Sequence, residues 1–268
     1  MPTFSASDRA RRQTPSGPSV AFVDLDDTLF RSRAKALREP GAPTDAAELE
    51  RFVGRPVTRT RDGRPYSYMS GSQDRLLDVL GRSFDALVPT TARTQDALRR
   101  VSLSWSSFAI CALGATLLEP DGRPDPELRA EADRRMSEDL GGISWAELAR
   151  SLDERFPALD VRRVEDDGRD VYLSVRGENS ADLAASVPLL ASAVPPGIVV
   201  SGHDRDVLIR AGRVGKADAV RWVLERHFPD AALTLGVGDR EDDAPFMIAC
   251  DFALTPSRSQ LARAWSAP

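Results

Sequence analysis

The sequence predicts an α/β fold: a doubly wound parallel sheet with a smaller α+β cap domain. Continuous apolar runs of strand length, typical of strands covered on both faces, recur along the chain. Segments with apolar residues at helical spacing separate them, and alternation of strand and helix is the pattern of a doubly wound sheet. Between two core segments, residues 120–204 carry helical and strand-like patterns of their own, which predicts an inserted cap.

Five core strands are expected from the apolar runs, at residues 20–23, 84–88, 108–111, 233–237 and 252–254. Helices should separate most of them. Helical spacing is found at residues 75–81, 95–101 and 217–227. In the last of these, Val220, Val223 and Leu224 fall on one face, which should pack on the sheet.

The inserted segment has a different pattern. Helices are expected at residues 127–136, 145–156 and 180–193, and strands at residues 170–175, 197–201 and 206–210. We therefore predict a core made of residues 19–119 and 205–268 and a cap made of residues 120–204. Residues 1–18 precede the first apolar run and are expected to form a disordered tail.

Composition and charge argue against several function classes. The net charge is −5 and the arginines alternate with acidic residues, which argues against a nucleic-acid-binding surface. No apolar stretch is long enough to span a bilayer. The Arg11-Arg12 pair is followed by an apolar run too short for an export signal, so a cytoplasmic protein with a small-molecule partner is expected. Cys111 and Cys250 lie in apolar strand-like segments, where reduced, buried cysteines are the ordinary outcome.

Two acidic clusters each follow an apolar run. Asp24-Leu25-Asp26-Asp27-Thr28 follows residues 19–23, and Gly238 to Asp243 follow residues 233–237. Because open α/β sheets bind ligands at the carboxyl ends of their strands, both clusters are expected at one ligand-binding edge. Mg²⁺ takes hard oxygen ligands and is commonly bound by one or two carboxylates plus substrate phosphate. The clusters therefore predict a metal-assisted phosphate site.

A lysine between the two clusters suits such a site. Only Lys35 and Lys216 are lysines among the 36 basic residues, and Lys216 begins a predicted helix, where free N–H groups and the helix dipole favour an anion. A compact, flexible ammonium follows the oxygens of a reacting phosphoryl group more easily than a planar guanidinium does. Lys216 is therefore predicted to bind the phosphoryl group.

With these residues the chain resembles the haloacid dehalogenase (HAD) superfamily, whose four motifs occur in the expected order over most of the sequence. Motif one corresponds to Asp24 to Thr28, motif two to Thr91, motif three to Lys216, and motif four to Asp239 with Asp243. The resemblance implies a HAD-like Rossmannoid core that carries the chemistry.

The resemblance also implies roles for these side chains. Asp24 would be the nucleophile that forms an aspartyl-phosphate, and Asp26 would be the general acid and base. The carboxylates of Asp24 and Asp239, the backbone carbonyl of Asp26, and Asp243 would hold Mg²⁺. Thr91 would hydrogen-bond a phosphoryl oxygen.

The carboxylate of Asp26 distinguishes chemistries within the superfamily. Transport ATPases have Thr at this position, which slows hydrolysis of their phosphoenzyme, and dehalogenases have no alkoxide to protonate. An alkoxide leaves badly unless a proton reaches it, and the same carboxylate can then take a proton from the attacking water. The expected function is Mg²⁺-dependent hydrolysis of a small phosphomonoester. The alternatives are a phosphomutase resembling eukaryotic phosphomannomutases and a noncatalytic protein that binds phosphorylated metabolites.

The position of the cap, between motifs two and three, resembles the Cof-like branch, which includes sucrose-phosphate, trehalose-phosphate and mannosyl-phosphoglycerate phosphatases. In these enzymes the cap closes over the substrate and selects it, which implies a sugar phosphate or a similar polar metabolite. Arg93 stands where the family commonly has the Arg of Thr-Gly-Arg, and it could serve phosphate, substrate or structure. The other candidates for substrate contact are Arg163, Arg176, His203 and Arg205.

Two features depart from the family pattern. The stretch from Phe30 to Gln73 is longer than usual, and its Pro, Gly and Arg content suggests ordered loops or a flap beside the nucleophile. Its candidates for reaching the substrate are Tyr66, Ser67, Tyr68 and Ser70; alternatively, the stretch pads the core or forms an oligomer contact. Asp242 stands where Cof-like members often have Asn, which keeps an oxygen but adds a charge beside the predicted metal ligands.

Overall fold

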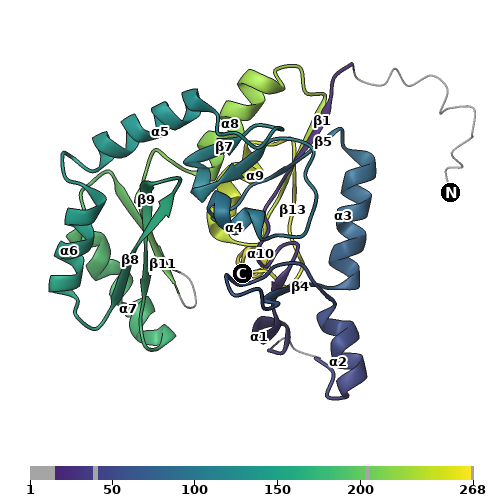
Figure 1. Ribbon diagram of the computed structural model, residues 1–268, viewed down its shortest axis with the longest axis horizontal. Coiled ribbons are helices and arrows are strands. Elements are labelled where there is room, and N and C mark those ends of the chain that lie inside the picture. The colour runs from purple at the N-terminus through teal and green to yellow at the C-terminus, as the bar shows by residue number, and fades with distance from the viewer. Residues whose placement is uncertain (1–15, 39–41, 203–205, 267–268) are drawn as a thin grey trace, which may run out of the picture.

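The structure is a computed structural model that describes residues 16–38, 42–202 and 206–266. Most of the tail predicted at residues 1–18 therefore lies outside the described residues. The described chain contains a core built on a parallel sheet, a cap built on a second sheet, and a segment after the first core strand that packs on the core (Figure 1).

A parallel sheet of four strands in the order β13-β12-β1-β5 forms the centre of the core. The strands are β1 (Ser19–Val23), β5 (Ala86–Pro89), β12 (Leu233–Val237) and β13 (Phe252–Leu254). Val23 pairs with both Val237 and Pro89, so β12, β1 and β5 end at the same edge of the sheet. β12 and β13 have the predicted bounds, β1 begins one residue earlier, and β5 begins two residues later than expected.

The strand predicted at residues 108–111 joins this sheet only loosely. It is β6 (Ala109–Cys111), and it reaches β5 through a single parallel bridge between Ile110 and Thr90. β6 pairs antiparallel with β7 (Thr116–Leu118), a strand that the sequence analysis did not predict.

Helices cover both faces of the core sheet. They are α3 (Gly71–Ser83), α4 (Gln95–Arg99), α8 (Lys216–His227), α9 (Ala244–Ile248) and α10 (Gln260–Ser266). Alternate residues of β1 point to opposite layers: Ala21 and Val23 pack in a cluster with residues of α3 and α4, and Val20 and Phe22 in a cluster with residues of α8 and α9. All four side chains are fully buried. The predicted doubly wound α/β core is confirmed.

The cap contains an antiparallel sheet in the order β10-β11-β9-β8, seen at the left of Figure 1. Its strands are β8 (Asp160–Asp166), β9 (Arg169–Arg176), β10 (Ile198–Gly202) and β11 (Val207–Ala211). Two helices, α6 (Trp145–Arg155) and α7 (Ser180–Ala193), pack against this sheet, where Leu173 and Val175 of β9 are fully buried. The capping box of Ser144 and Glu147 fixes the start of α6. The predicted smaller α+β cap is confirmed.

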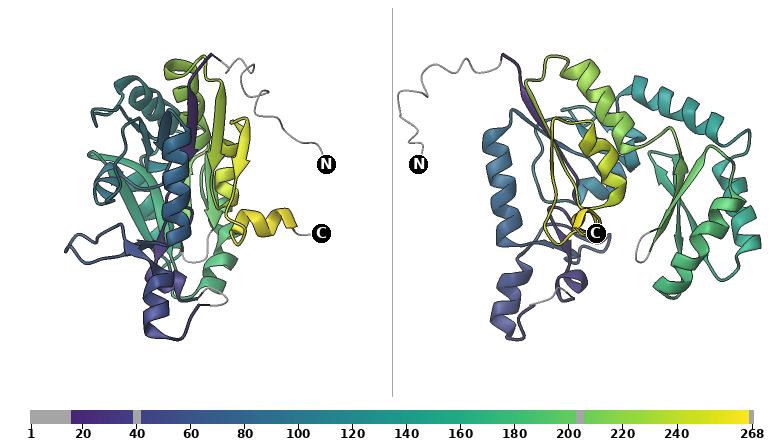
Figure 2. Two further views of the ribbon diagram at one scale, coloured as in Figure 1. Left: turned by 90° about the vertical axis from the view of Figure 1, so that its right-hand side faces the viewer. Right: turned by 180° about the vertical axis from the view of Figure 1, so that it is seen from behind.

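One helix packs against both the core and the cap. Leu128 of α5 (Pro126–Asp139) packs in a core cluster, whereas Ala132 and Met136 pack in the cap cluster. Figure 2 shows α5 and α8 side by side where the cap meets the core.

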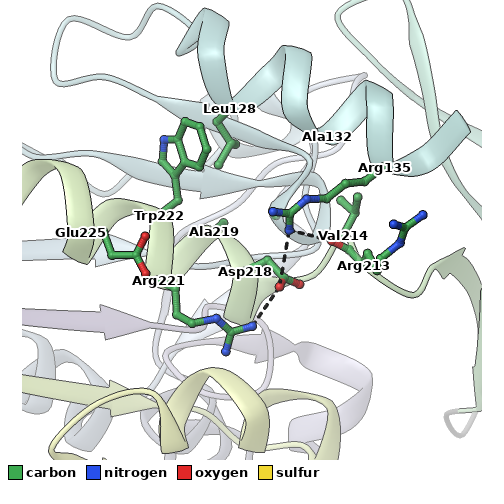
Figure 3. Close-up of a pocket in the computed structure, with 11 residues that line it drawn as sticks. Leu128, Ala132, Arg135, Arg213, Val214, Asp218, Ala219, Arg221, Trp222 and Glu225 are labelled. Atoms are coloured by element: carbon green, nitrogen blue, oxygen red, sulfur yellow. Dashed lines mark hydrogen bonds and ion pairs between the residues drawn. The ribbon is translucent and has the colours of Figure 1, made fainter. Parts of the chain in front are cut away.

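The linker from the cap to α8 is held at this junction. The backbone N–H and the Nε of Arg213 both donate to Asp139 on α5, at 2.9 and 2.7 Å. A cavity of about 150 Å³ lies between α5 and α8, and in it the guanidinium groups of Arg135 and Arg221 point to Asp218 from two sides (Figure 3). The segment that precedes Lys216 is therefore attached to α5, the helix that packs against both the core and the cap.

The long stretch after motif one is ordered where it is described; residues 39–41 are not described. It contains β2 (Arg31–Ser32), α1 (Arg33–Ala36), α2 (Ala46–Val53), β3 (Arg55–Pro56) and β4 (Ser67–Met69), with a small sheet in the order β2-β4-β3. Val57 and Met69 are almost fully buried in the core cluster that contains Leu80. The segment therefore packs on the core.

A close backbone approach at Gly114 sets the start of α8. Ala112, Leu113 and Gly114 all have positive φ, and the N–H of Ala112 donates to the carbonyl of Arg93 at 2.7 Å. A Cβ on Gly114 would lie 2.3 Å from the carbonyl oxygen of Gly215, the residue before Lys216. Only glycine leaves room for this contact.

We predict that Gly114→Ala lowers the free energy of unfolding by about 3 kcal/mol, because strain at positive φ adds to a backbone clash. Gly122→Ala is the matched control. Gly122 also has positive φ, 83°, but a Cβ added there would have no other atom within 4 Å, so a loss of about 1 kcal/mol is expected. Urea unfolding of both variants measures the difference, and equal losses would contradict the steric explanation.

Candidate active site

The nucleophile candidate lies immediately beyond the central strand. The N–H of Asp24 donates to the carbonyl of Val237 at 2.8 Å, which continues the β1–β12 ladder by one residue. Leu25 and Leu29 are fully buried and anchor the loop that follows. The carboxylate of Asp24 is therefore held, almost fully buried, at the carboxyl edge of the sheet.

Lys216 reaches this carboxylate from the first turn of α8. Its Nζ lies 2.6 Å from Oδ1 of Asp24 and 2.7 Å from Oδ1 of Asp243. The same nitrogen lies 5.6 Å from the ring centroid of Phe246, so an aromatic face covers it from another direction. Motifs one, three and four, which are far apart in the sequence, thus meet around one ammonium.

A threonine links the two acidic clusters. The hydroxyl of Thr28 lies 3.1 Å from Oδ2 of Asp24 and 3.2 Å from Oδ1 of Asp239. Oδ2 of Asp243 accepts from the backbone N–H groups of Asp239 and Arg240, both at 3.2 Å. The chain can approach Asp243 this closely because Gly238 has no Cβ; an added Cβ would lie 2.6 Å from that of Asp243.

Three carboxylates at this position can share one cation. Asp24, Asp239 and Asp243 are buried, and each offers an oxygen within 4.8 Å of the others. Such a set of hard oxygen donors, with charges that Lys216 alone does not balance, fits a divalent cation such as Mg²⁺. Asp242 is exposed on the same turn and lies outside this cluster.

Burial and mutual repulsion dominate the electrostatics. Burial, opposed by Lys216 and reinforced by Asp243, raises the pKa of Asp24 to about 7. Burial together with the charges of Asp24 and Asp243 raises the pKa of Asp239 to about 8. Burial lowers the pKa of Lys216, but Asp24 and Asp243 outweigh it and hold that pKa above its ordinary value. The lysine therefore stays charged.

The motif-two loop lies beside this cluster. The N–H of Thr90 donates to the carbonyl of Val23 at 2.9 Å, so Thr91 follows β5 at the same edge as Asp24. Thr91 is buried, and its Oγ1 accepts from the N–H of Arg93 at 3.1 Å. That hydroxyl keeps its own proton for another acceptor.

Arg93 makes a two-point contact with the predicted acid–base residue. Its Nε and Nη2 donate to the two oxygens of Asp26 at 2.6 and 2.7 Å. Its guanidinium also lies 5.2 Å from the ring centroid of Phe30, and the side chain is 16% exposed, against 46% for Asp26. Nη1 of Arg93 also donates to the carbonyl of Ala97 at 3.5 Å. Of the roles open to Arg93 on sequence, these contacts fit a structural one, in which it holds Asp26.

The cap hairpin β8–β9 docks on the motif-two loop, a contact that sequence reasoning missed. Asp166, near the hairpin tip, is 2% exposed and accepts from the backbone N–H of Gln95 at 2.8 Å and from the hydroxyl of Thr116 at 2.7 Å. The hydroxyl of Tyr172 on β9 donates to the carbonyl of Ala92 at 3.0 Å. No sequence pattern marked these residues, because their partners are distant in the chain.

The described residues place two of the four predicted cap contacts. Arg176 ends β9, forms an ion pair of 2.6 Å with Asp206, and lines the cleft between cap and core. Arg163 lies on β8 opposite Leu173, forms an ion pair of 2.8 Å with Asp170, and is not among the residues that line the cleft. His203 and Arg205 lie outside the described residues.

The cleft itself has a volume of about 1900 Å³ and reaches Thr28 and Asp239. Among the predicted residues of the long stretch, Tyr66 and Ser70 line it, and Tyr66 is 55% exposed. Ser70 caps α3 through its contact with Gln73. Ser67 is buried in β4, and Tyr68 pairs with Arg31 in the same small sheet.

Within the described part of the chain, every helix is too short or too polar to cross a lipid bilayer. Cys111 and Cys250 are both free, as expected, but only Cys111 is buried and Cys250 is half-buried. The segment around Cys250 is not the single strand that its apolar character suggested. Met247 lies in α9, and β13 begins only at Phe252.

No protein-family model matches the chain, and no curated protein matches it by sequence. Solved structures share its fold. The sucrose-phosphatase of Synechocystis, in complex with sucrose and phosphate, has a TM-score of 0.58 and 13% identity over 93% of this chain and 87% of that chain. A haloacid dehalogenase-like hydrolase from B. subtilis has a TM-score of 0.50 and 14% identity over 92% of both chains. A Thermoplasma acidophilum protein has a TM-score of 0.53 and 12% identity over 91% and 87%. The predicted resemblance to HAD-like structures is confirmed for the fold.

We predict that Asp166→Ala lowers the free energy of unfolding by about 3 kcal/mol, because three buried donors, two on Gln95 and one on Thr116, lose their acceptor. Asp78→Ala is the control, since Asp78 pairs with Arg75 and Arg82 on the exposed face of α3 and should cost less than about 1 kcal/mol. Guanidinium unfolding measures both. Similar values for the two variants would show that the docking contact contributes little.

A pH dependence follows from the raised pKa values of Asp24 and Asp239. Both groups bind a proton more tightly in the folded state, so folding is favoured while they are protonated, and stability falls as pH rises from about 5 through about 8. We expect a loss of roughly 2 to 4 kcal/mol between about pH 5.5 and about pH 8.5 in metal-free protein. Chemical unfolding across this range measures it.

Two further measurements check this pH dependence. Asp239→Asn should reduce the slope by about half, because one of the two titrating groups is gone. Saturating Mg²⁺ should stabilise the wild type most at high pH, where the carboxylates are ionised. A wild type whose stability rises across the same pH range would contradict the assignment.

Proposed function

We propose that this protein is a Mg²⁺-dependent phosphatase that hydrolyses a small phosphomonoester, a sugar phosphate or a similar polar metabolite, through an aspartyl-phosphate on Asp24. The observation that carries the proposal is the 2.6 Å contact between Lys216 Nζ and Asp24 Oδ1, beside two more buried carboxylates. Buried charges in such numbers weaken a fold unless they are compensated, and they cluster at functional sites.

In the first step an oxygen of Asp24 attacks phosphorus. A P–O bond to the carboxylate forms, the P–O bond of the ester breaks, and Asp26 gives its proton to the leaving alkoxide oxygen. The ammonium of Lys216 and the free hydroxyl proton of Thr91 bind the phosphoryl oxygens, whose charge they balance through the displacement.

In the second step the aspartyl-phosphate is hydrolysed. The carboxylate of Asp26 takes a proton from water, the water oxygen attacks phosphorus, and the bond to Asp24 breaks. Inorganic phosphate leaves, and both carboxylates return to their starting states. Asp24, Asp239, Asp243 and the backbone carbonyl of Asp26 would hold Mg²⁺, which when bound neutralises charge on the phosphoryl oxygens.

The contact between Arg93 and Asp26 adds a requirement. Both oxygens of Asp26 accept hydrogen bonds from the guanidinium of Arg93, so in this arrangement neither oxygen points to a leaving group. In this proposal Asp26 turns away from Arg93 when the substrate arrives. Its 46% exposure leaves it room to move.

The substrate class is proposed from the cap and from the fold neighbours. The cap that would cover the substrate extends past the boundary predicted at residue 204, because β11 (Val207–Ala211) pairs with β10 and β9 in the cap sheet. Residues 19–119 and the chain from α8 onward would form the catalytic core. The sucrose-phosphatase that shares this fold holds sucrose and phosphate, which supports a phosphorylated sugar for this chain. The two free cysteines suit the reducing cytoplasm, where we propose that the enzyme acts.

We predict that Asp24→Asn abolishes release of phosphate from a panel of sugar phosphates in the presence of Mg²⁺, because the nucleophile is lost. Asp26→Asn should slow the same reactions by about 100- to 10,000-fold, because the leaving group loses its acid. A colorimetric phosphate assay measures both. A wild-type rate equal to that of Asp24→Asn would contradict the proposal, and isomerised sugar phosphate without free phosphate would select the mutase.

p-Nitrophenyl phosphate separates the two steps, since nitrophenolate leaves without a proton. Asp26→Asn should release one equivalent of nitrophenol in a burst and then stall, because no base activates the water. Mass spectrometry should then find one phosphoryl group on the peptide that contains residue 24. A burst from Asp24→Asn would rule out this nucleophile.

A further inference from the structure

The motif-two loop, residues 91–95, is held from two sides. Its Arg93 contacts both oxygens of Asp26. Three consecutive carbonyls of the loop each accept one hydrogen bond: that of Thr91 from the N–H of Leu113 at 3.1 Å, that of Ala92 from the hydroxyl of Tyr172 at 3.0 Å, and that of Arg93 from the N–H of Ala112 at 2.7 Å. The first and third donors belong to the core, and the second belongs to the cap.

The cap holds the same loop again, two residues beyond Arg93. The carboxylate of Asp166 accepts from the backbone N–H of Gln95 at 2.8 Å and from its side-chain Nε2 at 3.3 Å. Both residues are buried, and hydrogen bonds to a buried charge are stronger than the same bonds in water. Arg93 therefore lies between two contacts with the cap, one at Ala92 and one at Gln95.

The side chain of Arg93 depends on the same anchors. Its Nη1 donates to the carbonyl of Ala97 at 3.5 Å, and Ala97 lies in α4, the helix that begins at Gln95. Arg93 is more buried than Asp26, so the guanidinium sets where the carboxylate lies. Contacts made by the cap on either side of Arg93 therefore reach Asp26.

The contact with Arg93 suits one of the two proposed steps. As a base, the carboxylate of Asp26 offers about four lone-pair sites, of which Arg93 occupies two, so others remain for a proton of the attacking water. As an acid, Asp26 must first turn away from Arg93. Hydrolysis of the aspartyl-phosphate is therefore the step that depends on where Arg93 lies.

We infer that two cap residues, Tyr172 and Asp166, are positioning residues for hydrolysis of the aspartyl-phosphate. They fix Arg93, and Arg93 places Asp26 beside the attacking water. This inference rests on the proposed phosphatase function and deepens it, because the cap then takes part in the chemistry as well as covering the substrate.

Formation of the aspartyl-phosphate should depend much less on the cap. The N–H of Thr91 donates to the carbonyl of Ile110 at 2.9 Å, and its carbonyl accepts from Leu113, so core segments hold the predicted phosphoryl ligand. Lys216 begins a core helix and contacts Asp24 directly. Loss of the cap contacts should therefore slow the second step selectively, whereas general damage to the fold would slow both.

Both steps can be measured with p-nitrophenyl phosphate, whose nitrophenolate leaves without a proton. At saturating substrate and Mg²⁺, kcat and the fraction of enzyme trapped as phosphoenzyme by acid quenching together give the rate constants of formation and hydrolysis. In Tyr172→Phe, which removes one hydroxyl, hydrolysis should slow about tenfold and formation should stay within about twofold of wild type, because only the base is misplaced. Asp166→Asn should act in the same direction.

Asp139→Asn is the matched control. Asp139 is also a buried carboxylate at the junction of cap and core, but it binds Arg213, in the linker before Lys216, and not the motif-two loop. Since Lys216 balances charge in both steps, this variant should change both rate constants by the same factor.

A double-mutant cycle tests whether the effect runs through the base. Once Asp26→Asn has removed the base, adding Tyr172→Phe should slow hydrolysis by less than about twofold. A further loss of about tenfold in that background, unchanged hydrolysis in Tyr172→Phe, or equal losses in both steps would overturn the inference and leave the phosphatase function standing. Absence of phosphoenzyme and of phosphate release from every ester would overturn the proposed function, and this inference with it.

Discussion

The contact on which the active site depends is the buried ion pair of Lys216 with Asp24 and Asp243. Three carboxylates gathered within a few ångströms repel one another, and the protein supplies one ammonium among them. The local structure holds this unfavourable group together: Gly238 admits Asp243, Gly114 admits the start of α8, and Thr28 links the two acidic clusters. Gathering these charges lowers the stability of the fold, which is expected at a site whose charges bind a ligand.

The cap is joined to that site through the loop that would bind phosphate. The tip of the β8–β9 hairpin docks on residues 92–95 through Asp166 and Tyr172, while the opposite end of β9, at Arg176, lines the cleft. One strand thus contacts the motif-two loop at one end and the ligand cleft at the other.

The sequence was sufficient to predict those strands and helices whose buried faces leave a recognisable pattern of apolar residues. Apolar runs located β1, β12 and β13, and helical spacing located α7 and α8, because buried faces leave periodic residues. β8 was missed since only Val161 and Val164 of its seven residues are apolar, and its cap neighbours stabilise it instead. The docking role of Asp166 could not be predicted either, because its partners lie 50 to 71 residues away and no motif marks them.

The two lysines differ in the same way: the sequence pattern identified one of them, and only the structure shows what the other contacts. Lys216 was identified from its place between two acidic clusters, whereas nothing in the sequence marked Lys35. In the structure each binds an aspartate of the same motif, Lys216 at Asp24 and Lys35 at Asp27. A guanidinium donates within a plane, but an ammonium donates in any direction, which suits carboxylates approached from a helix start and from a left-handed turn. In a chain whose other basic residues, the two histidines aside, are all arginine, both lysines thus form ion pairs with aspartates of motif one.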